Sequence, residues 1–496
     1  MEKRLMILEV SQKQSYIFAS KKLRENAARS EHISYVTGSR FFASAARELY
    51  QEEENLVYSG GGHTVLQFDS REAADAFART VTEQVMTRFP GMELFVKQMD
   101  YDASKTPGEN LKALSAALER KKAVRQASFR QLSFGLERAA GAETRCVDAG
   151  IRMPEDWVFP SRFEELAEQD AFLAVIHADG NGMGKRVEQI YEKCGDWASC
   201  CRTLRRFSEG IQRDFERAFR ATVEAVIAQG YPADRLPIRP VVLAGDDVCF
   251  VTAGSIGLEC ARVFLEKLSE LENSEQPGQP YAACAGVAIV HKKYPFHQAY
   301  ALAEELCSSA KRFGAEIDPE GRVSALDWHI EFGQLRDSLS AQREDYRTED
   351  GCRMELRPVA VLTPAGVDPE RVGQVTGGRR TYDFFRAMQR AMRGEYGRIA
   401  RGKLKELRTA VKQGRTATRF FLHDRQIGDL VYHSFSAQYR TEAERRDEYR
   451  KLLDGTSGGL QKDVFAEIDG VTRCLFFDAV EMIDHFEPFE EGKECL

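Results

Sequence analysis

The sequence contains no apolar run of about 18 residues and no N-terminal pattern of a secretory signal peptide. Neither membrane insertion nor secretion is therefore expected. Its 11 cysteines are an odd number and include no Cys-x-x-Cys pair, which argues against both a disulfide scaffold and a zinc ribbon. We expect a reducing, cytoplasmic setting for this protein.

The chain does contain enough apolar material for packed cores. Hydrophobic residues make up 43% of its 496 positions and aromatic residues 10%. A chain of this length and composition is typical of a globular protein with about three domains.

A Gly-Asp-Asp sequence stands between two short β-type runs near the middle of the chain. Residues 241–244 and 248–252 are rich in β-branched and aromatic residues, so Gly245, Asp246 and Asp247 are predicted to form the tip of a hairpin. Adjacent carboxylates repel each other, and a divalent cation such as Mg²⁺ relieves that repulsion. The alternative is a solvated turn, because Asp and Gly are ordinary turn residues.

A further carboxylate, Asp179, lies at the end of the buried run 172–176. It begins the sequence Asp-Gly-Asn-Gly-Met-Gly-Lys, which ends at Lys185. Closely spaced glycines let backbone N–H groups approach a polyphosphate, and the N-terminus of the following helix favours anions. Residues 204–227 then repeat apolar residues every three or four positions, which predicts a long amphipathic helix.

The rest of the pattern predicts two βαββαβ units, the ferredoxin-like arrangement of a palm domain. In the later unit, we expect helices over 256–271 and 296–313 and strands over 281–291 and 323–330. In the earlier unit, we expect strands over 4–10 and 92–99, a helix over 33–50, a hairpin over 56–68 and a helix around 77–89. The earlier hairpin tip carries His63 and no carboxylate, so the first palm is not expected to bind metal ions.

Several of these motifs resemble the second palm domain of the large, polymerase-like subunit of type III CRISPR effector complexes. They are Asp-Gly-Asn-Gly-Met-Gly, Ala-Gly-Asp-Asp-Val, Gly-Val-Ala-Ile-Val-His-Lys-Lys-Tyr-Pro-Phe, and a helix with Ala-Glu-Glu-Leu and Ala-Lys. GGDEF diguanylate cyclases and nucleotidyl cyclases are wider relatives. The resemblance covers residues 171–330, and residues 14–23 and 399–407 also resemble parts of the family. Ala244 replaces the usual first glycine of Gly-Gly-Asp-Asp.

The resemblance implies an α+β fold with two palm domains and a helical C-terminal domain. We expect a degenerate first palm with a trailing helix over 1–135, a connector over 136–170, a catalytic palm over 171–335 and the helical domain over 336–496. The family often has an HD nuclease domain before the first palm. We expect none here, because the chain begins directly at that palm.

The implied activity is that of a Mg²⁺-dependent nucleotidyltransferase joining nucleoside triphosphates, with ATP as substrate, into a cyclic oligonucleotide such as cyclic oligoadenylate for antiviral signalling. The alternative is a non-catalytic ATP-binding scaffold subunit of an RNA-containing complex. Two Mg²⁺ or Mn²⁺ ions are expected on Asp179, the Gly180 carbonyl, Asp246 and Asp247. The nucleotide is expected to contact Gly180, Asn181, Gly182, Gly184, Lys185, Gly245 and Lys311.

The charge of the C-terminal third is uneven, although the net charge of the whole chain is −7. From Arg379 to Arg425 there are 14 Lys and Arg against 4 Asp and Glu, a net +10. From Asp463 to Leu496 there are 2 against 10, a net −8. The basic segment is suited to RNA, to a partner subunit of a CRISPR complex, or to the acidic tail of its own chain.

Overall fold

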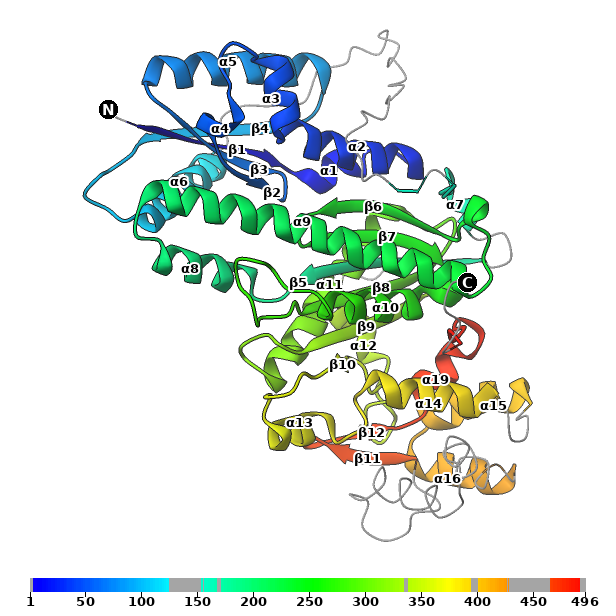
Figure 1. Ribbon diagram of the computed structural model, residues 1–496. Coiled ribbons are helices and arrows are strands. Elements are labelled where there is room, and N and C mark those ends of the chain that lie inside the picture. Colours follow the sequence, from blue (N-terminus) through cyan, green and yellow to red (C-terminus); the bar gives the residue numbers. More distant parts are fainter. Residues whose placement is uncertain are drawn as a thin grey trace.

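Figure 1 shows the computed structural model, which describes residues 3–124, 153–154, 156–166, 171–333, 338–393, 400–425, 427 and 464–490. Two units built of a sheet and helices are stacked on each other, and the C-terminal region packs against the second unit. The predicted α+β fold with two palm domains and a helix-rich C-terminal region is confirmed. Most of the expected connector over 136–170 lies outside the described residues.

The first palm is an antiparallel sheet with strand order β2-β3-β1-β4. Its strands are β1 (Arg4–Ser11), β2 (Leu56–Gly60), β3 (His63–Phe68) and β4 (Glu93–Asp100). Its helices are α1 (Lys13–Ile17), α2 (Leu23–Val36), α3 (Ser39–Ala45), α4 (Glu52–Asn55), α5 (Arg71–Arg88) and α6 (Pro107–Val124). The single helix expected over 33–50 is wrong. Gly38 has an extended backbone, with φ −106° and ψ 156°, and therefore separates α2 from α3.

The second palm has the same four-strand order and two added strands, giving β10-β9-β8-β5-β7-β6. These strands are β5 (Phe172–Gly180), β6 (Ile238–Ala244), β7 (Asp247–Ala253), β8 (Ala283–His291), β9 (Ser324–Glu331) and β10 (Val359–Leu362). Its helices are α7 (Phe163–Leu166), α8 (Met183–Lys193), α9 (Trp197–Ala228), α10 (Gly257–Ser269) and α11 (Phe296–Ile317), with 3₁₀ turns η1 (Ala233–Arg235) and η2 (Gly254–Ile256). Among the described strand pairs of this sheet, β8 and β9 run parallel and the others run antiparallel.

The two palms contact each other through equivalent elements. Helix α2 of the first palm packs against edge strand β6 of the second, and helix α9 of the second packs against edge strand β2 of the first. In Figure 1, α9 accordingly runs between the two sheets. The hairpin tips that follow β2 and β6 are thereby brought to the same interface.

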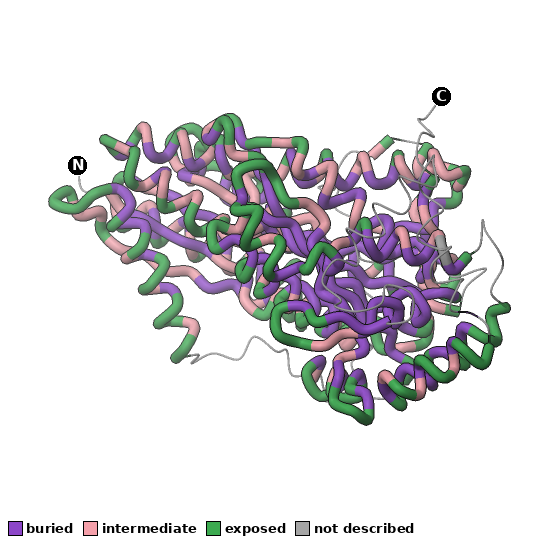
Figure 2. Tube along the Cα trace, turned by 90° about the horizontal axis from the view of Figure 1, so that it is seen from below, coloured by how far each residue is buried: buried purple, intermediate pink, exposed green. Residues whose placement is uncertain are grey.

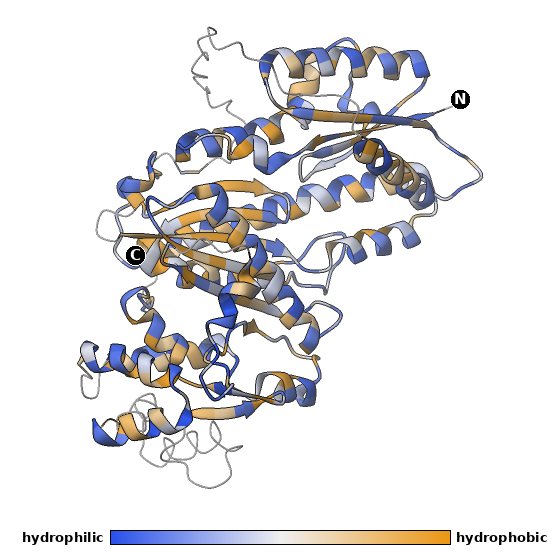
Figure 3. Ribbon diagram, turned by 180° about the vertical axis from the view of Figure 1, so that it is seen from behind, coloured by the Kyte–Doolittle hydropathy of each residue, from blue (hydrophilic) through white to orange (hydrophobic). Residues whose placement is uncertain are grey.

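The core lies in the sheets and in the helix faces that cover them. Strands β5 and β8 are buried along almost their whole length, as the purple central strands in Figure 2 and the orange strands in Figure 3 illustrate. The apolar stripe predicted in α9 is confirmed: its buried members include Leu204, Phe207, Ile211, Phe215, Phe219 and Val223. Burying a side chain of this size contributes about 1.5–3 kcal/mol.

The C-terminal region contains helices. It also contains three strands, which the sequence did not indicate. Its helices are α12 (Leu339–Glu344), α13 (Pro369–Thr376), α14 (Tyr382–Arg393), α15 (Arg401–Lys412), α16 (Arg415–Asp424) and α19 (Phe477–Glu481), with the 3₁₀ turn η3 (Met482–Asp484). Strand β10 extends the sheet of the second palm, and β11 (Phe465–Ile468) pairs with β12 (Val471–Cys474). No helix in the described part of the chain is long and apolar enough to cross a membrane.

The close packing of α11 on β8 depends on Gly286. A Cβ atom at this position would overlap the Ala303 carbonyl oxygen and the Cys307 backbone nitrogen, and neither backbone atom can move aside easily. Gly286→Ala should therefore lower the free energy of unfolding by about 1–3 kcal/mol, as overpacking does in other cores. Gly402→Ala, at a helix position with open space, is the matched control and should be neutral or slightly stabilising. Equal urea midpoints for the two variants would contradict this packing.

Candidate active site

The structure brings the three predicted carboxylates to one end of the second palm sheet. Strand β5 pairs antiparallel with β7 in a register that sets Asp179 opposite Asp247. Asp246 lies in the β6–β7 turn, and its carbonyl oxygen accepts a hydrogen bond from the Gly180 N–H at 3.3 Å. Residues separated by more than 60 positions in the sequence thus meet because of strand register alone.

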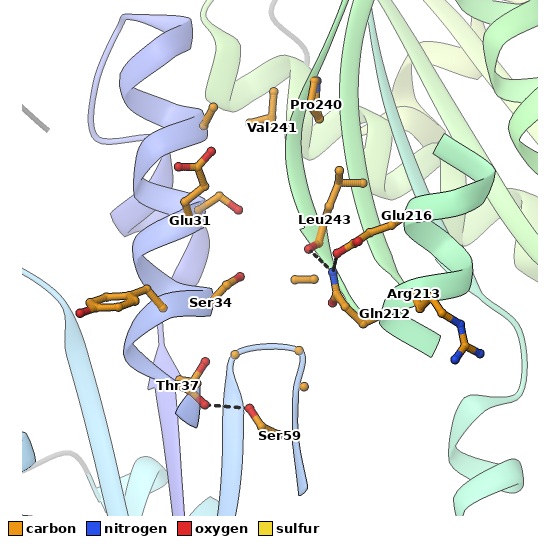
Figure 4. A pocket seen from close by; sticks show the side chains of 18 of the residues that line it. Glu31, Ser34, Thr37, Ser59, Gln212, Arg213, Glu216, Pro240, Val241 and Leu243 are labelled. Atoms are coloured by element: carbon orange, nitrogen blue, oxygen red, sulfur yellow. Dashed lines mark hydrogen bonds between the residues drawn. The ribbon is translucent and has the colours of Figure 1, made fainter. Parts of the chain in front are cut away.

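The turn that carries Asp246 is held by a side chain that the sequence did not single out. Gln212 on α9 accepts from the Gly245 N–H at 2.6 Å and donates to the Leu243 carbonyl oxygen at 3.1 Å. Its amide also donates to Glu216 at 2.6 Å, and Figure 4 shows Gln212 with Leu243 and Glu216. Gly245 has φ +70°, a conformation that favours glycine. In the sequence, Gln212 has no distinguishing spacing on a long helix.

The carboxylates destabilise one another's charged forms. Burial, followed by the charge of Asp179, raises the pKa of Asp246 to about 6. The same two causes, in the same order, raise the pKa of Asp247 to about 6. Such shifts at a cleft are typical of sites that bind a cation or exchange a proton.

Lys311 places a positive charge against Asp179. Its Nζ atom lies 2.6 Å from Asp179 Oδ2 and donates to the Gly180 carbonyl oxygen at 3.2 Å. Burial is the largest single effect and lowers the pKa of Lys311, but the charge of Asp179 and its hydrogen bond to the lysine, with smaller contributions from other groups, together make the net shift upward. Lys311, which was predicted to contact a triphosphate, is therefore paired with Asp179, a predicted metal ligand.

The glycine-rich segment after β5 is divided between two roles. Gly182, with φ +67°, is the N-cap of α8, so the predicted helix start beside the glycines is present. Asn181 is engaged with its own palm: its backbone N–H donates to Ala282 at 2.8 Å and its amide to Val323 at 2.9 Å. Lys185 donates to the Pro319 carbonyl oxygen at 3.1 Å. Gly184 has open space around it.

Two more titratable side chains face the carboxylates. His177 Nδ1 lies 3.5 Å from Asp247 Oδ1, and both atoms are buried without a hydrogen-bond partner. Burial lowers the pKa of His177 to about 4, so at neutral pH it does not neutralise Asp247. Burial and the charge of Asp247 raise the pKa of Glu304, on α11, to about 7. His177 lies two residues before the Asp-Gly-Asn-Gly-Met-Gly motif, and Glu304 is one of two glutamates in the Ala-Glu-Glu-Leu stretch, so neither was assigned a role from the sequence.

The oxygen donors at this site are suited to a hard cation that takes its remaining ligands from water and substrate. Within the described ranges, no three His, Cys, Asp or Glu side chains converge into a group that would hold a metal ion by themselves. Mg²⁺ commonly uses only one or two carboxylates together with water and substrate phosphates. The orphaned Asp247 Oδ1, the facing Asp179 and the Gly180 carbonyl oxygen satisfy that smaller requirement.

A pocket of about 1370 Å³ opens between the two palms beside this site. It is lined by α2, α9, β6 and the glycine tip of the first palm, and its wall includes Ala244, which directly precedes the Gly-Asp-Asp tip. Figure 4 shows Glu31 and Ser34 of the first palm facing Gln212 and Leu243 of the second across the open space. Trp157 and Phe159 add aromatic surface to the lining.

Comparison with known proteins gives a match over the second palm. Residues 172–316 match the family model described as Cas10/Cmr2, second palm domain. No curated protein matches the chain by sequence. These residues include all three carboxylates and Lys311.

Several solved structures share the fold. The structure of Csm1 in T. onnurineus matches with a TM-score of 0.56 and 13% identity over 97% of this chain and 69% of that one. An apo Csm1–Csm4 cassette matches with a TM-score of 0.53 and 15% identity, covering 85% and 65%. A Csm1–Csm4 cassette in complex with cA4 matches with a TM-score of 0.52 and 14% identity, covering 82% and 62%. The chain thus spans just over three fifths of the chains matched in the two cassettes, and the resemblance inferred from the motifs is confirmed.

The raised pKa values predict how the carboxylates affect stability. A group whose pKa is higher in the folded state contributes stability below its unfolded pKa of 3.8 and loses that contribution as the pH rises through about 6. Asp246→Asn with Asp247→Asn should therefore raise the melting temperature near pH 7.5 in EDTA. Because Asp247 is 46% exposed, solvent screening limits the expected gain to about 2–4 °C. Near pH 4 the gain should vanish. A gain of the same size at both pH values would mean that ionisation of these carboxylates is not its cause.

Proposed function

Because residues 172–316 match the Cas10/Cmr2 second palm domain, we propose that the chain is a Cas10-like large subunit and a Mg²⁺-dependent nucleotidyltransferase that joins ATP into a cyclic oligonucleotide. The observation that carries this proposal is the register that sets Asp179 against Asp247, with Asp246 beside them and Lys311 2.6 Å from Asp179. Carboxylates and a lysine at one strand end are suited to a metal-bound polyphosphate.

In the proposed reaction, a ribose hydroxyl oxygen of one nucleotide forms a bond to the α-phosphorus of another. The bond from that phosphorus to the bridging oxygen of the β-phosphate breaks, pyrophosphate leaves, and the hydroxyl proton passes to water. When bound, the divalent cation would lower the energy of the charge that develops on the phosphate oxygens.

The protein's own groups have separate roles in this proposal. Asp179, Asp247 and the Gly180 carbonyl would hold the cation, and Asp246 would complete its ligands. The Lys311 side chain would move from Asp179 to the phosphates once a cation neutralises the Asp179 carboxylate. The inter-palm pocket adjoining Ala244 offers the space for the base and ribose. Gln212 would keep the Gly-Asp-Asp tip in the geometry that these contacts require.

The alternative, a non-catalytic ATP-binding scaffold, gains little from the Ala244 substitution. The described non-glycine residues with positive φ are Gln12 and Asp469, so Ala244 adopts an ordinary backbone conformation that does not require glycine. The solved neighbours include a Csm1–Csm4 cassette in complex with AMPPNP and another in complex with pppApApA. These complexes favour a site that binds ATP and its linear product.

Asp246→Ala with Asp247→Ala should abolish pyrophosphate release from ATP while leaving the protein folded, because these side chains contribute charge rather than core packing. We expect a loss of at least about a thousandfold, which corresponds to about 4 kcal/mol of transition-state stabilisation. Release of labelled pyrophosphate with Mg²⁺, measured with and without added RNA, is the assay. Turnover near that of the wild type in a folded double variant would exclude this metal site.

The basic segment from Arg379 to Arg425 faces part of the acidic tail in the same chain. Asp484 forms ion pairs with Lys405 at 3.0 Å and with Arg401 at 3.5 Å. The Gln389 amide donates a hydrogen bond to the Ala479 carbonyl oxygen at 2.8 Å. The tail also supplies buried core residues such as Phe465 and Phe477. Arg401 and Lys405 nevertheless remain 75% and 66% exposed. Arg398, within the same basic segment, lies outside the described residues.

We infer that the exposed cations of α15 and α16 bind RNA phosphates. Arg401→Ala with Lys405→Ala should weaken RNA binding and flatten the dependence of log K on log salt by about 0.7 for each lost contact. Asp484→Asn should strengthen binding, because it removes a competing anion without deleting the core residues of the tail. Fluorescence anisotropy between about 50 and 200 mM salt measures both effects. Equally weak RNA binding by the wild type and both variants at low salt would favour a protein partner, such as a Csm4-like subunit.

A further inference from the structure

The first palm sends a short segment, Gln12 to Gln14, to the carboxylates of the second palm. It directly follows β1, and Gln12 adopts a left-handed conformation with φ 52° as the N-cap of α1. The equivalent position after β5 in the second palm is Gly182, with φ 67°. A left-handed backbone is unfavourable for glutamine, and such strain is concentrated at positions where the surrounding structure requires it.

The segment is anchored across the palm interface. The Gln14 amide donates to Glu304, which lies on α11 of the second palm and experiences the charge of Asp247. On the side of the first palm, Lys13 Nζ donates to the carbonyl oxygen of Gly61 at the β2–β3 tip. Lys13 and Gln14 are therefore adjacent in the sequence but form hydrogen bonds with different palms.

Lys13 packs on the first-palm hairpin tip, and that tip lies beside the Gly-Asp-Asp tip of the second palm. A Cβ atom at Gly62 would lie 2.8 Å from Lys13 Cε and 3.1 Å from Nζ, so the lysine packs directly over this glycine. A Cβ atom at Gly245 would lie 3.7 Å from the Gly61 nitrogen, so the Gly-Asp-Asp tip lies directly beside the first-palm tip. The Lys13 charge acts on Asp247, where it partly offsets the rise in pKa.

We propose that Lys13 is a nucleotide-binding residue that the first palm supplies to the second palm's site, where it contacts the phosphates of the bound nucleotide. An ammonium group has three donors, and one is directed to the Gly61 carbonyl oxygen, which fixes the lysine at the first-palm tip that adjoins Gly245. Lys311 approaches the same carboxylates from α11, so the two lysines provide cations from the two palms. This inference rests on the proposed function and gives the first palm, whose tip has no carboxylate, a direct part in it.

The test compares Lys13→Gln with Lys13→Arg and with a control, Lys21→Gln. Glutamine keeps a donor for Gly61 and removes the charge, arginine keeps the charge, and Lys21 is an exposed lysine of the same palm. Binding of AMPPNP, AMP and adenosine is measured in Mg²⁺ by calorimetry, and pyrophosphate release gives KM and kcat for ATP. Melting temperatures verify that each variant is folded.

Loss of one charge-assisted contact should weaken AMPPNP binding about tenfold and raise the KM for ATP by a similar factor. The weakening should be smaller for AMP and absent for adenosine, because it depends on phosphate charge. Lys13→Arg should recover most of the affinity, and Lys21→Gln should match the wild type.

Each other outcome overturns the inference in a distinguishable way. If the wild type turns over ATP and Lys13→Gln behaves like Lys21→Gln, the role of Lys13 is wrong and the proposed function stands. If AMPPNP and adenosine lose affinity equally, Lys13 supports the fold rather than the phosphates. If the wild type neither binds AMPPNP nor releases pyrophosphate, the proposed function fails and the inference fails with it. Should Lys13→Gln not fold, Lys13→Met carries the same comparison.

Discussion

The site depends on repulsion between carboxylates that the backbone holds together. Antiparallel pairing of β5 with β7 sets Asp179 opposite Asp247, and the β6–β7 turn adds Asp246. Because burial raises the cost of each charge, the pKa values of Asp246 and Asp247 rise to about 6. The strand hydrogen bonds and Gln212 oppose this repulsion, and Lys311 offsets part of it. The second palm thus holds together a carboxylate cluster whose repulsion a bound cation would relieve.

The paired palms extend this site beyond one domain. Each palm places a helix on the edge strand of the other, which brings a tip with carboxylates against a tip without them. The interface contains the large pocket, which Gln212 helps to line, and the segment that carries Lys13. The C-terminal region is also joined to the second palm: β10 extends its sheet, and Glu259 on α10 accepts from the Phe489 N–H at 3.2 Å. Function in this chain therefore has to be considered across its domains.

Sequence alone predicted the palm order and the carboxylates because strand and helix periodicity are local properties. The β5 run, the α9 stripe and the Gly245 tip all carry such local signals. Contacts between distant segments carry none. Gln212 looks like any helix residue, Lys13 like a surface lysine, and Glu304 like one of two adjacent acids until the fold assembles them. The break at Gly38 and the strands β10 to β12 were missed because short elements depend on tertiary pairing more than on their own composition.

A crystal structure with Mn²⁺ and AMPPNP would locate the metal by its anomalous signal. We predict an anomalous peak between Asp179 and Asp247, with Lys311 moved from Asp179 to a phosphate oxygen. A nucleotide bound elsewhere, or one bound with no metal peak and with Lys311 still paired to Asp179, would contradict this prediction.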